Sequence, residues 1–373
     1  MSPEPPEEGP PLDAIASVFR VYEVEVEADS GEIHYYGDPL ARAGEIRREL
    51  WPVFREQGFE LRVEYRLGEW MLVAEPIRLE NDGIPWTNVA LLVATVLTTL
   101  WAGAQWYWVE DLFSAEIVRA LPFMLAIMGV LGIHELGHYV MSRYHKVDAS
   151  LPYFIPVPTF IGTLGAVIKM RGQIPSRKAL FDIGVAGPLA GLVATVIVTV
   201  IGLYLPPVVV PEGGLTDPNA VQIQLGFPPL LEFLSWATGQ PLTYDEPGKS
   251  VNPVVIAGWV GMFVTFLNIL PVGQLDGGHI LRATVGERQE SIAALVPGVL
   301  FGLAGYLYYF RDVPADAAMI WAFWGVLALV FSYIGPANPI YEVELDRKRK
   351  VLAVVTFVLG ILCFTPVPIQ IVG

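Results

Sequence analysis

Residues 121–141, LPFMLAIMGVLGIHELGHYVM, place three ionisable side chains in a run that is otherwise apolar. The first twelve residues of the run carry no charge, and then His134, Glu135 and His138 follow one another closely. Burying such groups among apolar side chains costs free energy unless they have a partner or a function. The run therefore predicts a buried helix, and it predicts that the three polar side chains belong to a functional site on that helix.

The distribution of apolar residues indicates an integral membrane protein. Of the 373 residues, 53% are hydrophobic. After residue 86 they gather in blocks of about 18 residues or more, which is the length that spans a bilayer. The pattern predicts a polytopic α-helical membrane protein in which residues 87–373 form the transmembrane domain, with about seven spans. The expected spans are 88–108, 117–141, 179–205, 252–281, 291–310, 316–334 and 351–368.

The charge and the cysteine count exclude several classes of protein. A net charge of −15 argues against a nucleic-acid partner, because nucleic acids bind basic surfaces. The single cysteine, Cys363, rules out an internal disulfide and a zinc site built from cysteines. Residues 1–17 are acidic and rich in proline, so we expect a disordered tail there and no secretory signal peptide.

Residues 18–86 are expected to form a small soluble α/β domain. Alternating apolar and polar residues predict strands in VYEVEVEA and EIHYY, and the stretches ELRVEYR and WMLVAEP are typical of a hairpin. Asp38-Pro39 resembles a helix start, an N-cap followed by proline, and this helix should run toward Gly58. No catalytic constellation occurs in this domain, which favours a docking or regulatory module.

The basic residues predict the orientation in the bilayer, because cytoplasmic loops carry an excess of lysine and arginine. If the N-terminal domain is cytoplasmic, the opposite side holds only Arg119, Lys249 and Arg311. We therefore expect a multi-pass protein of the cell membrane with a cytoplasmic N-terminus and an outside C-terminus. Residues 206–250, rich in proline and glycine, should form an extramembrane loop. The cytoplasmic side would receive Arg143, Lys146, Lys169, Arg171, Arg177, Lys178, Arg282, Arg288 and the run at 347–350.

The stretch HELGH fits the pattern H-E-x-x-H, a metal-binding motif of metalloproteases. On a helix, His134 and His138 lie one turn apart on the same face and can hold one metal ion. Glu135 points about 100° away, where it can deprotonate a water molecule beside the metal. Two imidazoles leave a zinc ion short of ligands, so a third ligand must come from elsewhere in the chain.

A candidate third ligand lies in NILPVGQLDGGHI, residues 268–280. Asp276 falls near the cytoplasmic end of the fourth expected span, and HELGH has the same position in the second. A carboxylate at that depth completes a site of two histidines and one carboxylate, with an open position for water. By itself, Asp-Gly-Gly is typical of a turn. Gly277 and Gly278 would let the backbone approach closely, and Pro271 would break the helix so that Asp276 turns inward.

Two further polar residues in this stretch leave alternatives open. His279 is a competing third ligand, although a role behind the ligands or toward the substrate is favoured. Asn268 either hydrogen-bonds the backbone that Pro271 frees or donates to a developing oxyanion beside the metal. Of the remaining histidines, His145 is expected to be solvated, and His34 is expected at the surface, on a polar strand.

These residues closely resemble the site-2 protease family of intramembrane zinc metalloproteases. The resemblance rests on HELGH, on Asn268, Pro271 and Asp276-Gly-Gly, and on the glycine-rich FDIGVAGPLAG at 181–191. With its soluble N-terminal domain, the chain is most similar to the archaeal, cyanobacterial and plant chloroplast branch. The resemblance implies a catalytic core of three spans, the second to the fourth. It also implies Zn²⁺ on His134, His138 and Asp276, Glu135 as general base and acid, and Asn268 as an aid to the substrate or oxyanion.

The stretch LPYFIPVPTFIGTLGAVIKMRG, residues 151–172, is apolar but carries three prolines, so it cannot form an ordinary span. Irregular backbone at membrane depth is tolerated where it lines a protein cavity. We expect a re-entrant loop whose portion TFIGTLGAVI is strand-like and offers its edge to an unwound substrate. A merely interfacial loop is the alternative.

The predicted function is hydrolysis of a peptide bond in or near a transmembrane segment of a membrane-protein substrate, as in regulated intramembrane proteolysis. The partners would be that substrate and the lipid bilayer, and the active site would open toward the cytoplasm. The competing hypotheses are a catalytically silent membrane scaffold and a metal transporter. The intact Glu135 argues against a scaffold. Ligands that converge on one ion, rather than following a pathway, argue against a transporter.

Overall fold

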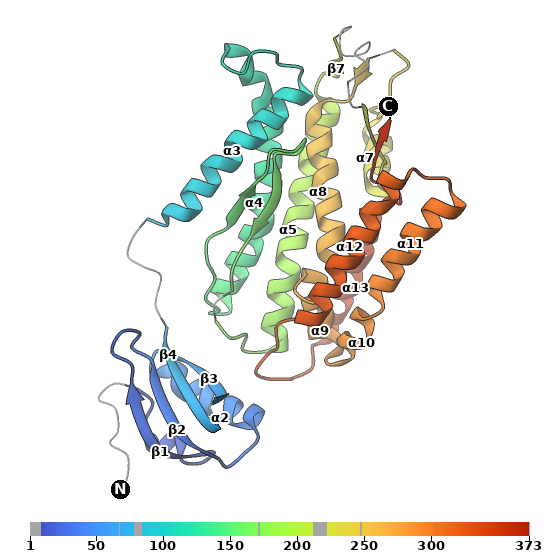
Figure 1. Cartoon of the computed structure of the whole chain (residues 1–373). Helices are drawn as coiled ribbons and strands as arrows, with labels where there is room; N and C mark the ends of the chain where they lie inside the picture. The colour runs from blue at the N-terminus through green and yellow to red at the C-terminus, as the bar shows by residue number, and fades with distance from the viewer. Residues whose placement is uncertain are drawn as a thin grey trace. The chain divides into compact units, whose positions relative to one another are not determined.

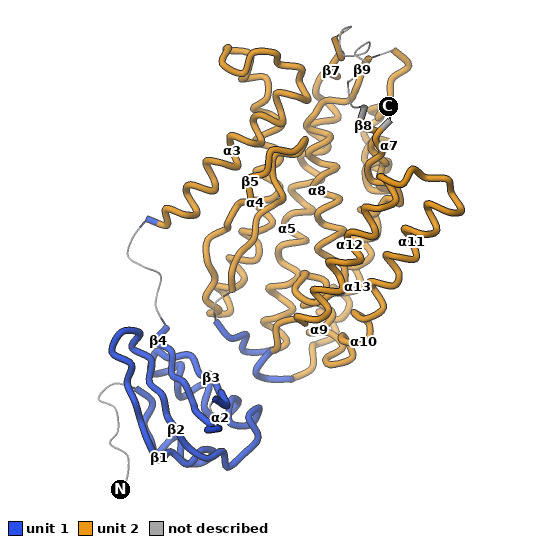
Figure 2. Tube along the Cα trace, in the orientation of Figure 1, with its two compact units in different colours: residues 1–84, 172–176, 339–342 blue, residues 85–171, 177–338, 343–373 orange. Residues whose placement is uncertain are grey.

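The computed structural model describes residues 9–66, 68–77, 84–170, 172–211, 222–246 and 248–372. The chain divides into two compact units, coloured separately in Figure 2. Unit 1 contains the N-terminal residues through Ile84 together with the short segments Gly172–Ser176 and Pro339–Glu342. Unit 2 contains Pro85–Arg171, Arg177–Asn338 and Val343–Gly373.

Unit 1 is built on a four-stranded antiparallel sheet with the order β1-β2-β4-β3 (Figure 1). One face of the sheet is covered by α2, whose buried residues Ile46, Leu50 and Phe54 are four positions apart and so lie on one side of the helix. The small N-terminal sheet that the alternating pattern predicts is therefore confirmed. Its elements are β1 (Phe19–Val26), β2 (Ile33–Pro39), α2 (Ala43–Glu56), β3 (Phe59–Arg66) and β4 (Glu69–Pro76).

The helix start expected at Asp38-Pro39 is wrong. These two residues close β2, where Pro39 lies opposite Phe19, and the next amide, that of Leu40, donates to Val18 O at 2.9 Å. The backbone of these residues is therefore paired with β1, and it cannot also form the first turn of a helix. The helix begins only at Ala43, where Arg42 and Glu45 form a capping box.

The expected disordered tail also needs correction where the structure describes it. Residues Leu12–Ile15 form the short helix α1, and the side chain of Ile15 is fully buried in the core of unit 1. The hydroxyl of Tyr35 donates to Pro10 O at 3.0 Å. An apolar side chain that completes a core holds its segment in place. The first eight residues of the predicted tail lie outside the described residues.

The two short inserted segments of unit 1 pair with each other, and one of them contacts α2 through Tyr341. Amides of Ile340 and Tyr341 donate to the carbonyls of Ile174 and Pro175, each at 3.0 Å. The Tyr341 hydroxyl donates to Arg48 O at 3.2 Å. Gly172–Ser176 therefore belongs to unit 1, although it directly precedes the long helix of unit 2 that begins at Arg177.

Unit 2 contains five helices that are long and apolar enough to cross a membrane, counted over the described part of the chain. They confirm five of the seven expected spans. They are Trp86–Trp106 (α3), Ala115–Tyr144 (η1, Ala115–Ala120, with α4, Leu121–Tyr144), Arg177–Tyr204 (α5), Arg288–Phe310 (α10, Arg288–Ala293, with α11, Val296–Phe310) and Ala315–Ile334 (α12).

The other two expected spans differ from the prediction. Residues 252–281 are not one helix, because α8 (Pro253–Ile269) ends before Pro271 and α9 (Asp276–Val285) begins a new direction. Leu270 adopts the extended conformation that a following proline favours. Helix α13 (Arg347–Leu362) opens with four basic residues, which lowers its apolar length. A count of seven spans therefore remains a prediction.

The residues that position the site lie where α4, α5 and α8 pack together in the core of unit 2 (Figure 1). Phe123 and Ile127 of α4, Leu192 of α5 and Trp259 of α8 belong to one buried cluster. Helix α9 packs against α5. This arrangement brings the start of α9 back to the helix that carries HELGH.

Two connections in unit 2 carry structure of their own. The predicted strand-like stretch forms a hairpin of β5 (Tyr153–Pro156) and β6 (Thr163–Val167). Within the predicted loop 206–250 lie β7 (Val208–Val209), β8 (Gln222–Leu225), α7 (Pro229–Thr238) and β9 (Lys249–Ser250), and β8 pairs with β10 (Ile369–Val372). The extramembrane position of this region and the re-entrant position of the hairpin remain predictions.

Candidate metal centre

The three polar side chains of HELGH are buried inside unit 2. His134, Glu135 and His138 of α4 are only 4%, 7% and 6% exposed. Asp276, the first residue of α9, faces the two imidazoles and is partly buried. The break at Pro271 makes this possible, because it frees Asp276 from the direction of α8.

The ligand atoms of the three residues have the spacing of one tetrahedral ion. His134 Nε2 and His138 Nε2 are 3.2 Å apart. The Asp276 oxygens lie 3.3 Å from His134 Nε2 and 3.2 Å from His138 Nε2. Ligands at about 2.1 Å from a tetrahedral zinc are separated from one another by roughly 3.4 Å. The donor set therefore fits a zinc ion, and all three atoms point toward one place.

The orientation of His138 is fixed by a backbone carbonyl on α5. His138 Nδ1 lies 2.8 Å from Ile183 O, so Nδ1 carries the proton and donates it. The lone pair of Nε2 is then directed toward His134 and Asp276. Such a bond behind a ligand sets its tautomer and its ring plane. Sequence reasoning missed Ile183, because a carbonyl oxygen leaves no signal in the residue type.

The glycine-rich stretch of α5 makes room for both imidazoles. A Cβ atom on Gly187 would lie 2.0 Å from His138 Nε2, and one on Gly191 would lie 2.8 Å from His134 Nδ1. Any side chain at Gly187 would occupy the position of the ring. The glycines of this stretch therefore let α5 pack closely against α4 and leave space for the two metal-binding rings.

Glu135 and Asn268 flank the ligand group from two sides. The Glu135 carboxylate lies near the backbone N–H of Ile168, directly after β6, which packs against α4. Asn268, on the last turn of α8, places its Nδ2 atom 3.2 Å from His134 Nε2. Both side chains therefore lie beside the position that a metal ion would take. Of the two roles left open for Asn268, this contact favours the one at the metal.

Comparison with known proteins identifies this region. Residues 122–301 match the family model described as Peptidase family M50. Residues 122–301 are a peptidase family M50 domain. The predicted resemblance to the site-2 protease family is thereby confirmed. With its five long apolar helices, the chain that carries this M50 domain is a multi-pass membrane protein.

Curated relatives of the M50 domain come from plants. The chain is 33% identical over 267 residues to the "Probable zinc metalloprotease EGY1, chloroplastic" of Arabidopsis thaliana, covering 69% of this chain and 45% of that protein. It is 31% identical over 277 residues to "Probable zinc metalloprotease EGY2, chloroplastic" of the same plant, covering 71% and 46%. The chain thus spans less than half of the length of these relatives.

One solved structure is also similar, the "Site-2 Protease from Methanocaldococcus jannaschii". The identity is 18%, and the match covers 68% of this chain and 92% of that one. The TM-score of 0.31 is too low to support any argument about the fold.

In the M50 domain, His279 lies outside the group of converging ligand atoms. His279 is buried, and its Nδ1 atom has no hydrogen-bond partner among the described residues. Its Cβ faces Gly184 of α5. The ligand atoms that converge within the described part of unit 2 are those of His134, His138 and Asp276. The geometry thus favours Asp276 over His279 as the third ligand.

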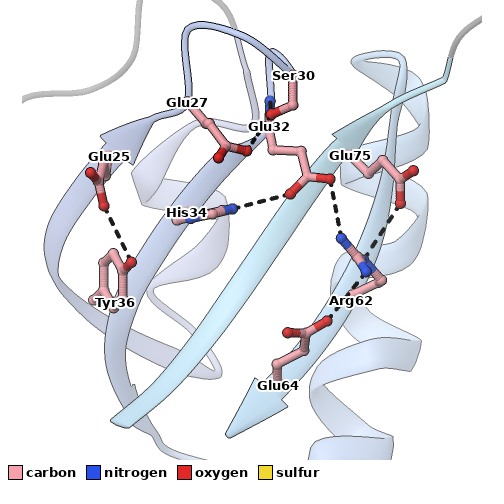
Figure 3. Close-up of polar contacts among 9 residues, drawn as sticks. All are labelled: Glu25, Glu27, Ser30, Glu32, His34, Tyr36, Arg62, Glu64 and Glu75. Carbon is pink, nitrogen blue, oxygen red and sulfur yellow. Dashed lines mark hydrogen bonds and ion pairs between the residues drawn. The ribbon is translucent and has the colours of Figure 1, made fainter. Parts of the chain in front are cut away.

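A second group with metal-ligand spacing lies on the sheet of unit 1 (Figure 3). It consists of Glu27, Glu32 and His34. Glu32 is bound by His34 and by the Arg62 guanidinium, each at 3.2 Å, and Glu27 accepts from Ser30. Arg62 supplies the positive charge that these carboxylates would otherwise take from an ion. This partly exposed group is therefore a network of ion pairs. The His34 side chain is 18% exposed, so the expected surface position is found only in part.

His145 likewise differs from the expectation of a solvated side chain. Its Nε2 atom lies 3.0 Å from Asp182 Oδ2, and Asp182 is also bound by Arg349 at 2.6 Å. These contacts join the end of α4 to α5 and to the first turn of α13. The cluster ties three helices together beside the M50 site.

Proposed function

We propose that this chain is an intramembrane zinc metalloprotease that hydrolyses a peptide bond in or near a transmembrane segment of another membrane protein. The observation that carries the proposal is the convergence of three buried ligand atoms at the spacing of a single ion, with Glu135 beside them. The names of the curated plant relatives, zinc metalloproteases, support the choice of metal and of activity. Regulated intramembrane proteolysis is the process that such an activity would serve.

The roles of the residues follow from their positions. His134, His138 and Asp276 would hold the zinc ion, which acts as a Lewis acid and lowers the pKa of water. Glu135 takes the proton of the attacking water and then delivers a proton to the leaving amide nitrogen. The Asn268 amide donates to the carbonyl oxygen as negative charge develops there.

The hairpin is proposed to bind the substrate. Among the described strands, β6 pairs only with β5, so its other edge is free. The backbone groups of Lys169 bond to Ser150 on the β5 side, and neighbouring residues in an extended strand alternate in direction. Ile168 therefore directs its N–H away from β5, and this N–H lies near Glu135. An unwound substrate segment added to this edge would run past the general base.

The alternatives are less consistent with the site. A silent scaffold would not require Glu135 to be buried beside three converging ligands. A metal transporter would distribute its ligands along a path. The orientation, with a cytoplasmic N-terminus and a site that opens toward the cytoplasm, is part of the proposal and rests on the basic residues.

Removal of zinc tests the proposed function. Purified full-length protein in bicelles, with a labelled single-span substrate, should lose cleavage on chelation and regain it on addition of about one equivalent of zinc. Mass spectrometry should locate the cut within or beside the apolar segment. Equal cleavage by the chelated protein, or a cut confined to a soluble domain, would contradict the proposal.

Asn268→Ala tests the position of the amide. Because Asn268 is not one of the three converging ligands, the variant should keep wild-type zinc content. Its kcat should fall about 10²- to 10³-fold, the usual effect of losing one oxyanion donor. Zinc loss in parallel with activity would instead make Asn268 a residue that supports His134.

A further inference from the structure

Three side chains of α3 hold the backbone of the β5–β6 hairpin. Asn88 Nδ2 donates to Leu151 O and Pro152 O, each at 3.0 Å. Thr98 Oγ1 donates to Gly162 O at 2.6 Å. Trp106 Nε1 donates to Phe160 O at 2.7 Å. These donors are distributed from the first turn of α3 to its last.

The carbonyls that α3 binds lie at the base of the hairpin and at its turn. They belong to residues outside β5 and β6. Within the hairpin, Gly162 O also accepts from the Val157 N–H at 3.3 Å, and Leu151 O also accepts from Ser150 Oγ at 3.0 Å. An unsatisfied carbonyl is costly in apolar surroundings. Helix α3 supplies a second donor to Gly162 O and Leu151 O, and it also donates to Pro152 O and Phe160 O, so this helix holds the hairpin backbone at both ends.

The turn of the hairpin lies directly against α3. Gly162 has a φ of +86°, and a Cβ atom there would lie 2.5 Å from Thr99 Cα and 2.6 Å from Thr98 O. Only glycine fits so close to a neighbouring backbone. The Thr98 hydroxyl binds the carbonyl of this same glycine, so the contact is both close and directional.

The other end of β6 reaches the candidate site. Five residues, Thr163–Val167, separate the turn from Ile168, whose N–H lies near the Glu135 carboxylate, and β6 packs against α4, the helix that carries Glu135. Strand β6 joins the turn to Ile168 and is paired with β5 between them, so a shift of the turn is expected to shift Ile168 as well. The hairpin is thus fixed to α3 at Gly162 and meets Glu135 at Ile168.

We propose that α3 sets the position of the free edge of β6 relative to Glu135, with Thr98 as the principal positioning residue and Asn88 and Trp106 in support. The inference rests on the proposed function, since it concerns how the substrate strand is held for cleavage. Thr98 does not contact the ligand group. It acts through the hairpin.

The test compares Thr98→Val, Thr98→Ser and Thr95→Val in the full-length, zinc-loaded protein. Thr95 is a matched control, because its hydroxyl donates to Leu91 O at 2.8 Å, within α3 itself. Valine at 98 keeps the shape and removes the donor, and serine keeps the donor. Should Thr98→Val fail to fold, Trp106→Phe removes the indole N–H that donates to Phe160 O while it keeps an aromatic ring at this position.

Thr98→Val should raise KM for a single-span substrate about 3- to 10-fold, the effect of one lost hydrogen bond, with kcat and zinc content little changed. Hydrogen exchange of the amides at 160–168 should accelerate. Thr98→Ser and Thr95→Val should match the wild type in both measurements.

The outcomes separate this inference from the proposed function. If the wild type cleaves, and Thr98→Val keeps the KM and the exchange rates of Thr95→Val, the positioning role is overturned. A fall in kcat with zinc loss would overturn it too, because the effect would then be a general disturbance of the site. Failure of the wild type to cleave any single-span substrate would overturn the proposed function, and with it this inference.

Discussion

Glu135→Gln should lower kcat by about 10²- to 10⁴-fold while the zinc content stays at one ion per chain. The amide has the size of the carboxylate but cannot take a proton from water. Glu135 is buried next to His134 without being one of the three converging ligands, so the metal should not depend on it. The measurements are initial rates of cleavage of a single-span substrate and zinc by elemental analysis, on the same preparation.

Two comparisons make this result specific. Glu116→Gln, at an exposed position in η1 just before α4, should cleave at the wild-type rate. A Glu135→Gln protein that cleaves normally would exclude Glu135 as the general base. One that loses its zinc would show that Glu135 supports the ligands instead. If neither the wild type nor Glu135→Gln cleaves while both bind zinc, the scaffold hypothesis would become the better one.

The histidine pair of the site could be predicted because its geometry depends only on the period of an α-helix. His134 and His138 are four positions apart on one helix, and any α-helix places them on one face. Asp276 could be predicted as a ligand only from the expected topology, because the second and fourth expected spans end at the same depth in the membrane. The family resemblance indicated zinc as the metal and the roles of the residues. The structure adds the distances between the ligand atoms.

The parts that could not be predicted depend on tertiary contacts or on backbone atoms. The carbonyl of Ile183 and the bond from Thr98 to Gly162 involve groups that every residue carries, so residue type gives no signal. The break between α8 and α9 was predicted from Pro271, but counting apolar residues still gave 252–281 as one expected span. Asp38-Pro39 has the composition of a helix start, but pairing with Phe19 decides in favour of the strand.

Gly187→Ala should abolish stable zinc binding although it adds only one methyl group. The new Cβ would lie 2.0 Å from His138 Nε2, and no Cβ tolerates a neighbour that close. The imidazole cannot turn aside freely, because Nδ1 is bound to Ile183 O at 2.8 Å on the same helix α5. Either this hydrogen bond breaks or α4 and α5 move apart. Both displace a ligand, so we expect zinc affinity to fall at least about 100-fold.

Two control variants distinguish the loss of ring space from a general effect of alanine. Gly129→Ala changes α4 where nothing lies within 4 Å, and it should bind zinc normally. Gly184→Ala changes α5 one turn away, where the nearest atom is His279 Cβ at 3.3 Å, and it should reduce affinity only slightly. Zinc affinity is measured by competition with a chromogenic chelator, and helix content by circular dichroism. Wild-type affinity in Gly187→Ala would mean that α4 and α5 are not packed at the distance argued here, and the arrangement of His138 against α5 would have to be abandoned.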